Sequence, residues 1–333
     1  MARILLTTSA PSDPILRQLP RRSAGWCTHD FVVALDDGPF DSWVVYDNLD
    51  SIKTANVQRR DTLLITGEPP SVRSYRARFT SQFGSVRTSH PSIQHACIER
   101  SHEAQMWHYG MHACRSHPQV LDYDMLAAFT PPPKPKLLSV ISSNKSVTPD
   151  HRQRLVFVER LRQAFGDCID VFGRGIRELE DKADAIWDYR YHIVLENDHS
   201  DCYMSEKLPD AFLGWSYPFY SGSKFAAKIF PSSSFSRIDM YRPEESIALI
   251  QRHIQADSYT SNLDWIGNAR AKVLDETNLF AVICKRMVSR EIQSGTQPKV
   301  KNPRVSRRTT LFPKRKSVRL MFQRMLRTIE LAA

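Results

Sequence analysis

Residues 189–207 read YRYHIVLENDHSDCYMSEK, and this stretch decides the fold class. It starts with a short apolar strand at 192–195, which ends in a run of polar residues. A helix is expected next, with Ser205 as its N-cap, Glu206 in its first turn and Pro209 early enough to be tolerated. A strand that leads through polar residues into a capped helix predicts an α/β protein.

The same alternation of short apolar strands and helices recurs along the chain. Apolar residues at helical spacing in 154–165 predict a helix between two of these strands. Such an order predicts mainly parallel sheets, whose ligands bind at the carboxyl ends of the strands. Further strands are predicted at 3–7, 43–46, 62–66, 137–142, 169–172, 217–220 and 235–238.

A proline-rich segment divides the two series of strands. Residues 130–136 read TPPPKPK, and prolines at this density keep a chain extended. We therefore expect two Rossmann-like domains that face a cleft. The predicted boundaries are 1–130 for the N-terminal domain, 131–136 for the linker, 137–292 for the C-terminal domain and 293–333 for a basic tail.

Composition places the chain among globular proteins. It has 333 residues, 41% of them hydrophobic and 25% charged. Its longest apolar runs fall far short of the roughly 20 residues that a membrane-spanning helix needs. Six scattered cysteines suggest free thiols in a reducing compartment, and the N-terminus resembles a first strand more than a signal peptide. These features predict a cytoplasmic protein.

The excess of positive charge lies in the C-terminal tail. The chain has 46 Lys and Arg against 36 Asp and Glu, and residues 299–333 hold eleven of the basic residues and one acid. The rest is neutral, which removes the main support for nucleic-acid binding. Apolar residues from Val318 to Ile329 recur at helical steps among arginines, and such a helix suits an anionic membrane surface. The alternatives are a solvated tail and a nucleic-acid contact.

Two patterns that resemble metal sites have simpler interpretations. Residues 122–124 read DYD and precede a helix-like stretch, so we expect them to cap it. His108 and His112 stand four residues apart, but no carboxylate completes an HExxH arrangement. No metal site is predicted. Acceptor contacts or ordinary packing are the interpretations left open for this segment, with Trp107 and Tyr109 as candidates to stack on a sugar.

The opening stretch resembles the signature of glycosyltransferase family 10, the alpha-1,3/4-fucosyltransferases, in their bacterial form. That signature reads roughly Y-K-F-x-x-x-x-E-N-S, a short spacer and Y-V-T-E-K. This chain has Asp198 for the serine, Met204 for the valine and Ser205 for the threonine. These changes are mild, and Ser205 keeps the hydroxyl that caps the helix.

Other segments resemble the same family in the same order. The resemblance is strong over about residues 136–285, thin before them and absent from the tail. An ordered set of motifs is more specific than any single tetrapeptide. The matching segments are 66–68 (TGE), 143–144 (SN), 154–161 (RLVFVERL), 169–173 (IDVFG), 217–222 (YPFYSG) and 230–235 (FPSSSF).

The matched positions imply roles for individual residues. Glu68 would be the general base that takes a proton from the acceptor hydroxyl. The alternative is an ordinary turn glutamate beside Pro69 and Pro70. The implied donor site contains Arg154 and Lys207 for the diphosphate charge, Asn197 and Tyr203 for hydrogen bonds to it, and Glu206 for a ribose or sugar hydroxyl.

The resemblance further implies a GT-B-like fold, with the acceptor side in the N-terminal domain and the nucleotide sugar in the C-terminal domain. It implies GDP-β-L-fucose as donor, a glycan hydroxyl as acceptor and inversion at the anomeric carbon. Fixed cations beside the diphosphate make a divalent ion unnecessary, so no cofactor is expected. The implied setting is the inner face of a bacterial membrane, with a lipopolysaccharide or capsule precursor as acceptor. Transfer of another GDP-sugar and a non-catalytic, basic-tailed binding protein are the alternatives.

Overall fold

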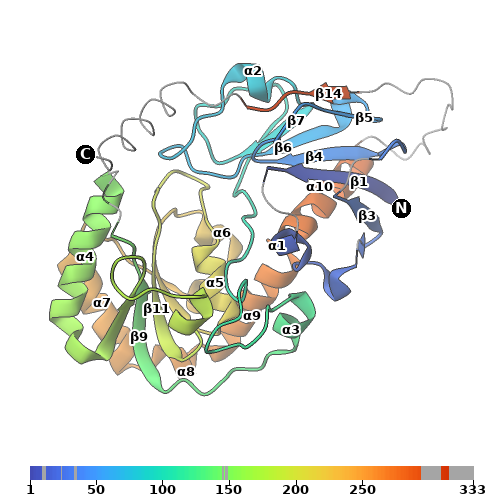
Figure 1. Ribbon diagram of the computed structural model, residues 1–333. Coiled ribbons are helices and arrows are strands. Elements are labelled where there is room, and N and C mark those ends of the chain that lie inside the picture. Colours follow the sequence, from blue (N-terminus) through green and yellow to red (C-terminus); the bar gives the residue numbers. More distant parts are fainter. Residues whose placement is uncertain are drawn as a thin grey trace, which may run out of the picture.

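The computed structural model describes residues 1–9, 13–23, 25–33, 36–144, 146, 149–293 and 309–314. Two β-sheets with helices around them lie one above the other in Figure 1. Both sheets are mainly parallel, which confirms the predicted α/β class and the GT-B-like pairing of two Rossmann-like halves. The positions of the predicted strands are confirmed as well, with ends that shift by at most three residues.

The first sheet contains seven strands in the order β2-β3-β1-β4-β6-β7-β8. Neighbours pair in parallel except β2 and β3, which are antiparallel. Leu5, Trp43 and Leu64 on the central strands are fully buried, as expected for a parallel sheet covered on both faces. The strands are β1 (Ala2–Thr8), β2 (Gly25–Trp26), β3 (His29–Val32), β4 (Ser42–Tyr46), β6 (Thr62–Ile65), β7 (Ser85–Thr88) and β8 (Ile98–Arg100).

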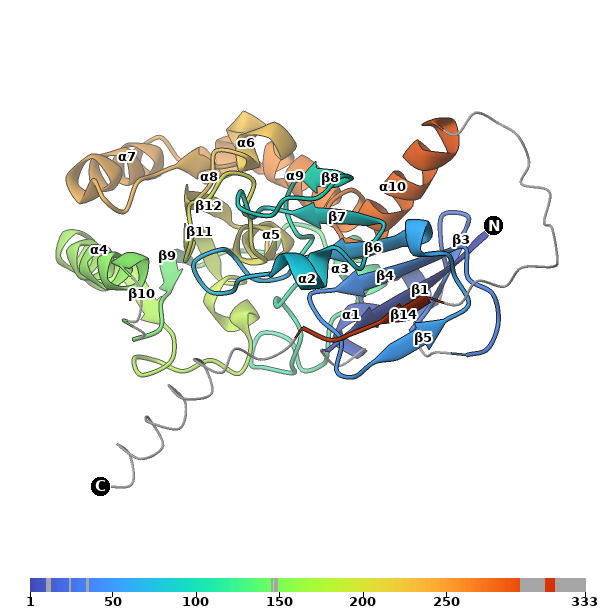
Figure 2. The ribbon, with the colours of Figure 1, turned by 90° about the horizontal axis from the view of Figure 1, so that it is seen from above.

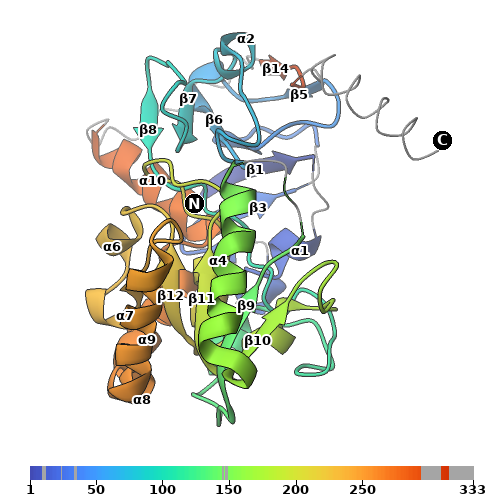
Figure 3. The ribbon, with the colours of Figure 1, turned by 90° about the vertical axis from the view of Figure 1, so that its left-hand side faces the viewer.

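The second sheet has the order β10-β9-β11-β12-β13 and is parallel throughout. Its strands are β9 (Lys136–Ile141), β10 (Ile169–Phe172), β11 (Tyr189–Leu195), β12 (Tyr217–Ser221) and β13 (Ser236–Arg237). The helix predicted at 154–165 is α4 (Pro149–Phe165), which begins earlier because proline is favoured in a first turn. Figure 3 shows α4 beside α7 (Pro243–Gln255), and the two helices are in contact.

Helix α5 (Lys207–Leu213) packs against α9 (Leu263–Asp275) and against strands β11 and β12. These contacts bury the apolar face of α5, where Leu208 and Phe212 are fully buried. The remaining helices are α1 (Asp13–Leu16), α2 (Ala77–Thr80), α3 (Tyr123–Ala128), α6 (Ala226–Ile229), α8 (Ser258–Ser261) and α10 (Leu279–Gln293).

Helix α10 follows the second sheet in the sequence but packs on the first. Leu279, Phe280 and Ile283 share one apolar cluster with Ile4 and Phe31. The rings of Phe31 and Phe280 meet edge to face with centroids 4.8 Å apart. The two halves are therefore joined by packing at α10 as well as by the linker, and the predicted domain boundaries stay a prediction.

The linker is extended, as prolines require, and it is pinned to the second half. The buried Lys134 ammonium donates to the carbonyls of Trp187 at 2.8 Å and Gly214 at 2.7 Å. Burial lowers the pKa of Lys134 well below its usual value. These bonds satisfy a buried polar group and fix the path of the linker.

Part of the basic tail forms a strand, which the sequence did not indicate. Strand β14 (Thr309–Leu311) pairs antiparallel with β5 (Lys53–Ala55), and Figure 2 shows the two beside the first sheet. Leu311 is buried in the apolar cluster of that sheet. The amphipathic helix predicted at 318–329 lies outside the described residues. Among the described helices, none is both long and apolar enough to span a bilayer.

Candidate active site

The two loops that carry the predicted site residues meet between the sheets. Residues 66–68 follow β6, and residues 196–203 follow β11, so both loops extend from carboxyl ends of parallel strands. The Gln105 amide bridges them, because it donates to the Gly67 carbonyl at 2.6 Å and to the Tyr203 hydroxyl at 3.5 Å. The Ser71 amide donates to Asp198 at 3.0 Å as a second link.

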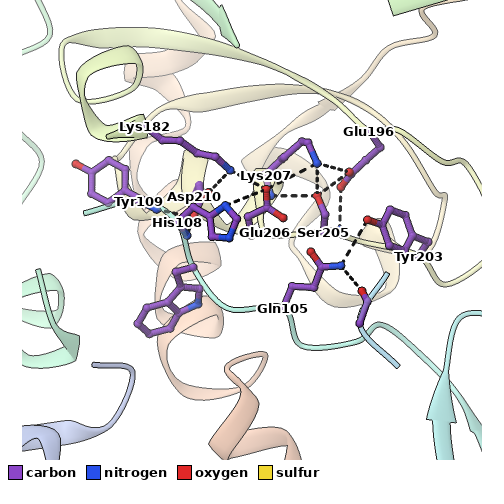
Figure 4. A network of polar contacts seen from close by, with 12 residues as sticks. Gln105, His108, Tyr109, Lys182, Glu196, Tyr203, Ser205, Glu206, Lys207 and Asp210 are labelled. Carbon is purple, nitrogen blue, oxygen red and sulfur yellow. Dashed lines mark hydrogen bonds and ion pairs between the residues drawn. The ribbon is translucent and has the colours of Figure 1, made fainter. Parts of the chain in front are cut away.

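The buried Glu196 side chain holds the second loop in place. Its carboxylate is completely buried and accepts hydrogen bonds from the Ser205 amide at 2.9 Å and the Ser205 hydroxyl at 2.6 Å. The Lys207 ammonium lies 3.4 Å from Glu196 and 3.0 Å from the Ser205 hydroxyl (Figure 4). A buried carboxylate needs such partners, so Glu196 sets the direction of Lys207.

The predicted N-cap at Ser205 is confirmed. The Glu206 backbone already has helical angles and its carbonyl accepts from the Asp210 amide at 2.8 Å, so Glu206 is in the first turn. The Ser205 hydroxyl accepts from the Lys207 amide at 3.3 Å, which is the bond that an N-cap side chain makes. The hydrogen-bonded span of α5 starts one residue later, because Pro209 has no amide hydrogen to donate to the Ser205 carbonyl.

Glu206 lies between two lysines. Lys182, on the 3-10 helix η4 (Lys182–Ala185), contacts Glu206 Oε1 at 2.7 Å and Asp210 at 2.8 Å, and Lys207 approaches the same Oε1 at 3.7 Å. Burial alone would raise the pKa of Glu206, but the charges of Lys182 and Lys207 hold it well below its usual value. Glu206 is therefore a fixed anion whose Oε2 makes no bond within the described part of the chain.

Arg154 and Asn197 form the other half of the predicted donor site. The buried Arg154 guanidinium donates from Nη1 to Asn197 Oδ1 at 2.6 Å and from Nη2 to the Ser143 carbonyl at 3.2 Å. Burial lowers the pKa of Arg154. Asn197 directly follows Glu196 in the chain. Arg154 is hydrogen-bonded to Asn197 and Lys207 is paired with Glu196, so the two cations contact consecutive residues of one turn.

A cavity of about 330 Å³ lies at the carboxyl ends of β9 and β10. Two of its lining residues, His108 and Lys182, contact Glu206, but none of the predicted donor-site residues lines it. Gly173 on its wall has a φ of 133°, and a Cβ there would lie 2.2 Å from the Ser142 carbonyl, so only glycine fits. The volume falls within the range of small-molecule sites. Its lining includes His108, Ile141, Gly173, Arg174, Asp181 and Lys182.

Glu68 enters the site from the opposite loop. It is half-buried, and its carboxylate has no hydrogen-bond or ion-pair partner among the residues described. The backbone around it is held firmly, since Gly67 donates to the Tyr75 hydroxyl at 3.0 Å and the Glu68 carbonyl contacts His90 Nε2 at 2.7 Å. The structure thus brings Glu68, Tyr203 and the turn of Arg154 and Lys207 to the same region.

The aromatic residues proposed to stack on a sugar are placed elsewhere. Trp107 and Tyr109 are 1% and 0% exposed and pack in the apolar core of the second half, so of the two interpretations left open for them ordinary packing is confirmed and sugar stacking is not. The sequence did not indicate the burial of Trp107 and Tyr109, because they alternate with polar residues and are buried by contacts with distant helices. Asp122 caps α3 by accepting from the Met125 amide at 3.1 Å, which confirms the capping interpretation.

The histidine segment is also explained by contacts within the chain. His108 Nδ1 lies 3.5 Å from Glu206, and the His112 amide donates to Asp181 at 2.9 Å. The described residues contain no group of three or more side chains arranged to hold a metal ion. Sequence reasoning missed Lys182 and Gln105, because each acts through a partner far away in the chain.

We predict that Lys182→Met destabilises the fold. The substitution removes the cation that two buried carboxylates share, which costs about 3 kcal/mol for a broken buried pair. Denaturation by urea measures the loss. Lys272→Met, which removes a surface pair with Glu276 on α9, is the matched control and is expected to change little. Equal stability of the two variants would contradict the prediction.

A second prediction concerns Glu103, which is completely buried beside the Glu68 loop. Its Oε1 accepts from the Ser89 amide at 3.0 Å, and burial raises its pKa to about 8. The folded chain therefore holds a proton that the unfolded chain releases near pH 4.5, so stability falls as pH rises from there to about 8. We expect thermal unfolding of Glu103→Gln to show a flatter pH dependence over this window, and an unchanged slope would refute it.

Two mainly parallel sheets whose loops meet at their carboxyl ends are the fold expected of a GT-B-like glycosyltransferase. The family model described as glycosyltransferase family 10 (fucosyltransferase), C-terminal part, matches residues 131–302. This match spans half of the chain, and the chain belongs to glycosyltransferase family 10. It is therefore a glycosyltransferase. A search of curated proteins found no match.

Solved structures similar to this chain carry related descriptions. One is an alpha1,3-fucosyltransferase, at 16% identity over 79% of this chain and 80% of that chain, with a TM-score of 0.46. An alpha1,3-fucosyltransferase with GDP gives 16% identity over 82% and 90% and a TM-score of 0.47. A glycosyltransferase from Rickettsia africae ESF-5 gives 11% identity over 89% and 99% and a TM-score of 0.41.

Proposed function

We propose that this protein transfers L-fucose from GDP-β-L-fucose to a hydroxyl of a glycan, with inversion at the anomeric carbon. One observation carries the proposal beyond the family. Arg154 is hydrogen-bonded to Asn197 and Lys207 is paired with the adjacent Glu196, while Glu68, whose carboxylate has no partner among the described residues, comes from the facing loop. These contacts support an active site in which the two cations act on the donor and Glu68 acts on the acceptor.

The cations act on the leaving group. The bond that breaks joins the sugar carbon to a phosphate oxygen, and the electron pair leaves with GDP. The sugar becomes positively charged as the diphosphate gains negative charge. Fixed positive charges that need no reorganisation lower such a barrier, and Lys207 and Arg154 supply them.

Glu68 acts on the acceptor. A general base must come within about 3 Å of the hydroxyl whose proton it removes. Glu68 is held by its backbone and its carboxylate has no partner in the described chain, so both oxygens are available. Attack by that hydroxyl opposite the departing diphosphate gives an α-L-fucoside. The proton that leaves the hydroxyl goes to Glu68.

Three further side chains bind the donor. Asn197 Oδ1 is taken by Arg154, which leaves the Asn197 amide group to donate to the diphosphate. Burial keeps the pKa of Tyr203 well above its usual value, so its hydroxyl keeps the proton that it donates. Glu206 uses Oε1 for Lys182, and its Oε2 accepts from a ribose or sugar hydroxyl. Each role uses the atom that the protein's own contacts leave open.

The basic tail places the enzyme at an anionic membrane, where lipid-linked lipopolysaccharide or capsule precursors are the acceptors. Its eleven basic residues support this, since each contributes on the order of 1 kcal/mol near such a surface. Binding to anionic vesicles that is lost at high salt tests this part. Equal binding to neutral vesicles, or none to either, contradicts it.

Transfer assays with the purified protein test the function. GDP-fucose, GDP-mannose and GDP-glucose are offered with fucose-free glycans that have free 3- and 4-hydroxyls, with and without EDTA. We expect fucosylated product with GDP-fucose, insensitivity to EDTA, and an α-anomer by NMR. Preference for another GDP-sugar would show that GDP-fucose is not the donor. Absence of both transfer and donor hydrolysis would indicate a binding protein.

A further inference from the structure

The C-terminal segment 309–314 pairs with the N-terminal half of the chain, which is the proposed acceptor side. In the antiparallel pair, Thr309 lies opposite Ala55 and Leu311 opposite Lys53. The Thr309 hydroxyl donates to the Val57 carbonyl at 2.7 Å, and Leu311 is 1% exposed. Burial of its leucine side chain removes apolar surface from water, which stabilises the strand in this position.

The three residues after the strand are guided toward the Glu68 loop. The Phe312 amide donates to Gln82 Oε1 at 2.8 Å, and the Lys314 amide donates to Asn48 Oδ1 at 2.7 Å. With its backbone held, Lys314 places its ammonium 4.1 Å from the centre of the Tyr75 ring. That distance is well inside the range of a cation–π contact.

Tyr75 in turn holds the backbone around Glu68. Its hydroxyl accepts from the Gly67 amide at 3.0 Å and donates to Asp47. Its ring meets His90 edge to face at 5.0 Å, and His90 Nε2 contacts the Glu68 carbonyl at 2.7 Å. The Gly67 amide is thus tied to Tyr75 directly, and the Glu68 carbonyl is tied to it through His90.

We propose that Lys314 is a positioning residue, through which strand β14 fixes the Glu68 loop by way of Tyr75. The proposal rests on the proposed role of Glu68. It gives the tail a second task beside membrane attachment: the same segment completes the acceptor side of the active site. Because the Glu68 carboxylate has no partner of its own among the described residues, its position depends on these backbone contacts.

The charge of Lys314 is sensitive to pH. Burial, then the positive charge of Arg73, lowers the pKa of Lys314 to about 8, although Asp47 acts in the opposite direction. The groups that face Lys314 are Asp47, Arg73, Tyr75 and His90. The cation, and with it the contact to Tyr75, is therefore present at pH 7 and lost as pH rises through about 8.

Full-length variants test the proposal in assays with a small soluble acceptor. Lys314→Met keeps the aliphatic stem and removes the charge, and we expect kcat to fall about 10-fold at pH 7 with the KM for GDP-fucose unchanged. Lys314→Arg keeps the cation and is expected to restore kcat and to retain it above pH 8, where the wild type declines. Lys272→Met is the control and is expected to match the wild type.

Two more measurements separate the outcomes. Tyr75→Phe removes the hydroxyl link to Gly67, and its effect on kcat is expected not to add to that of Lys314→Met. Hydrogen exchange of the amides at 66–75 is expected to rise in Lys314→Met while the melting temperature stays close to that of the wild type.

Three results would each overturn the positioning role of Lys314. They are a kcat of Lys314→Met equal to that of the wild type, effects of Lys314→Met and Tyr75→Phe on kcat that add, and unchanged hydrogen exchange of the amides at 66–75 in Lys314→Met. An inactive wild type, or an active Glu68→Gln variant, would instead overturn the proposed function. If the proposed function fails, hydrogen exchange still tests whether Lys314 positions the Glu68 loop, because this measurement does not depend on turnover.

Discussion

Replacing Lys207 by methionine is expected to lower kcat for fucose transfer by about 10³-fold, the effect of removing one preorganised stabilising group from a transition state. Lys207 is held by Glu196 and Ser205, so its charge is already in place when the diphosphate departs. Arg154 remains on the far side of the turn and accounts for the residual rate. Steady-state kinetics with GDP-fucose measure the change.

The fold is expected to survive this substitution. Glu196 keeps both hydrogen bonds from Ser205, so its buried carboxylate is not left without partners. Calorimetric binding of GDP and the melting temperature check this, with Lys272→Met again as the control. A kcat close to that of the wild type in a folded Lys207→Met variant would remove Lys207 from the catalytic machinery.

Glu68→Gln is expected to lower transfer by about 10³-fold, within the range that general bases contribute. Glutamine has the same shape but does not take a proton. Because the Glu68 side chain makes no bond with the described residues, the substitution leaves the loop and the donor site intact. The affinity for GDP-fucose is therefore expected to stay unchanged, while transfer to every acceptor is lost.

The matched control for this variant is Glu276→Gln, which alters an exposed glutamate on the surface of the second half. Transfer and donor binding are measured on the same preparations. Loss of donor affinity together with transfer would place Glu68 in the donor site, and full activity would make it an ordinary turn glutamate beside Pro69 and Pro70.

Most of the candidate site could be proposed from the sequence, because its residues fall in short motifs that resemble the family. Asn197, Tyr203, Glu206 and Lys207 lie between the end of β11 and the start of α5, so one stretch of sequence holds all four. Glu68 belongs to a second such motif, in the loop that follows β6. Lys182 carries no local signal, since its partners Glu206 and Asp210 lie on another element.

The sequence did not predict burial where it depends on contacts between segments that are far apart in the chain. Trp107 and Tyr109 look available in a polar segment, yet Asp210 accepts the Tyr109 amide at 3.0 Å and draws this segment into the second half. The N-cap at Ser205 needed no distant contact, because its hydroxyl accepts from the amide two residues further along the chain. Boundaries of elements are the least certain part of any pattern.

The sequence by itself determined the α/β class, the strands of the second sheet and three strands of the first, the family and the side chains available for chemistry. These depend on periodicities of two and 3.6 residues and on motifs of a few neighbours, which a linear string contains. The tertiary structure alone decided that α10 returns to the first sheet, that β14 pairs with β5, and that Lys314 lies on Tyr75. Such contacts join residues hundreds of positions apart, and their free energy comes from burial that no local pattern records.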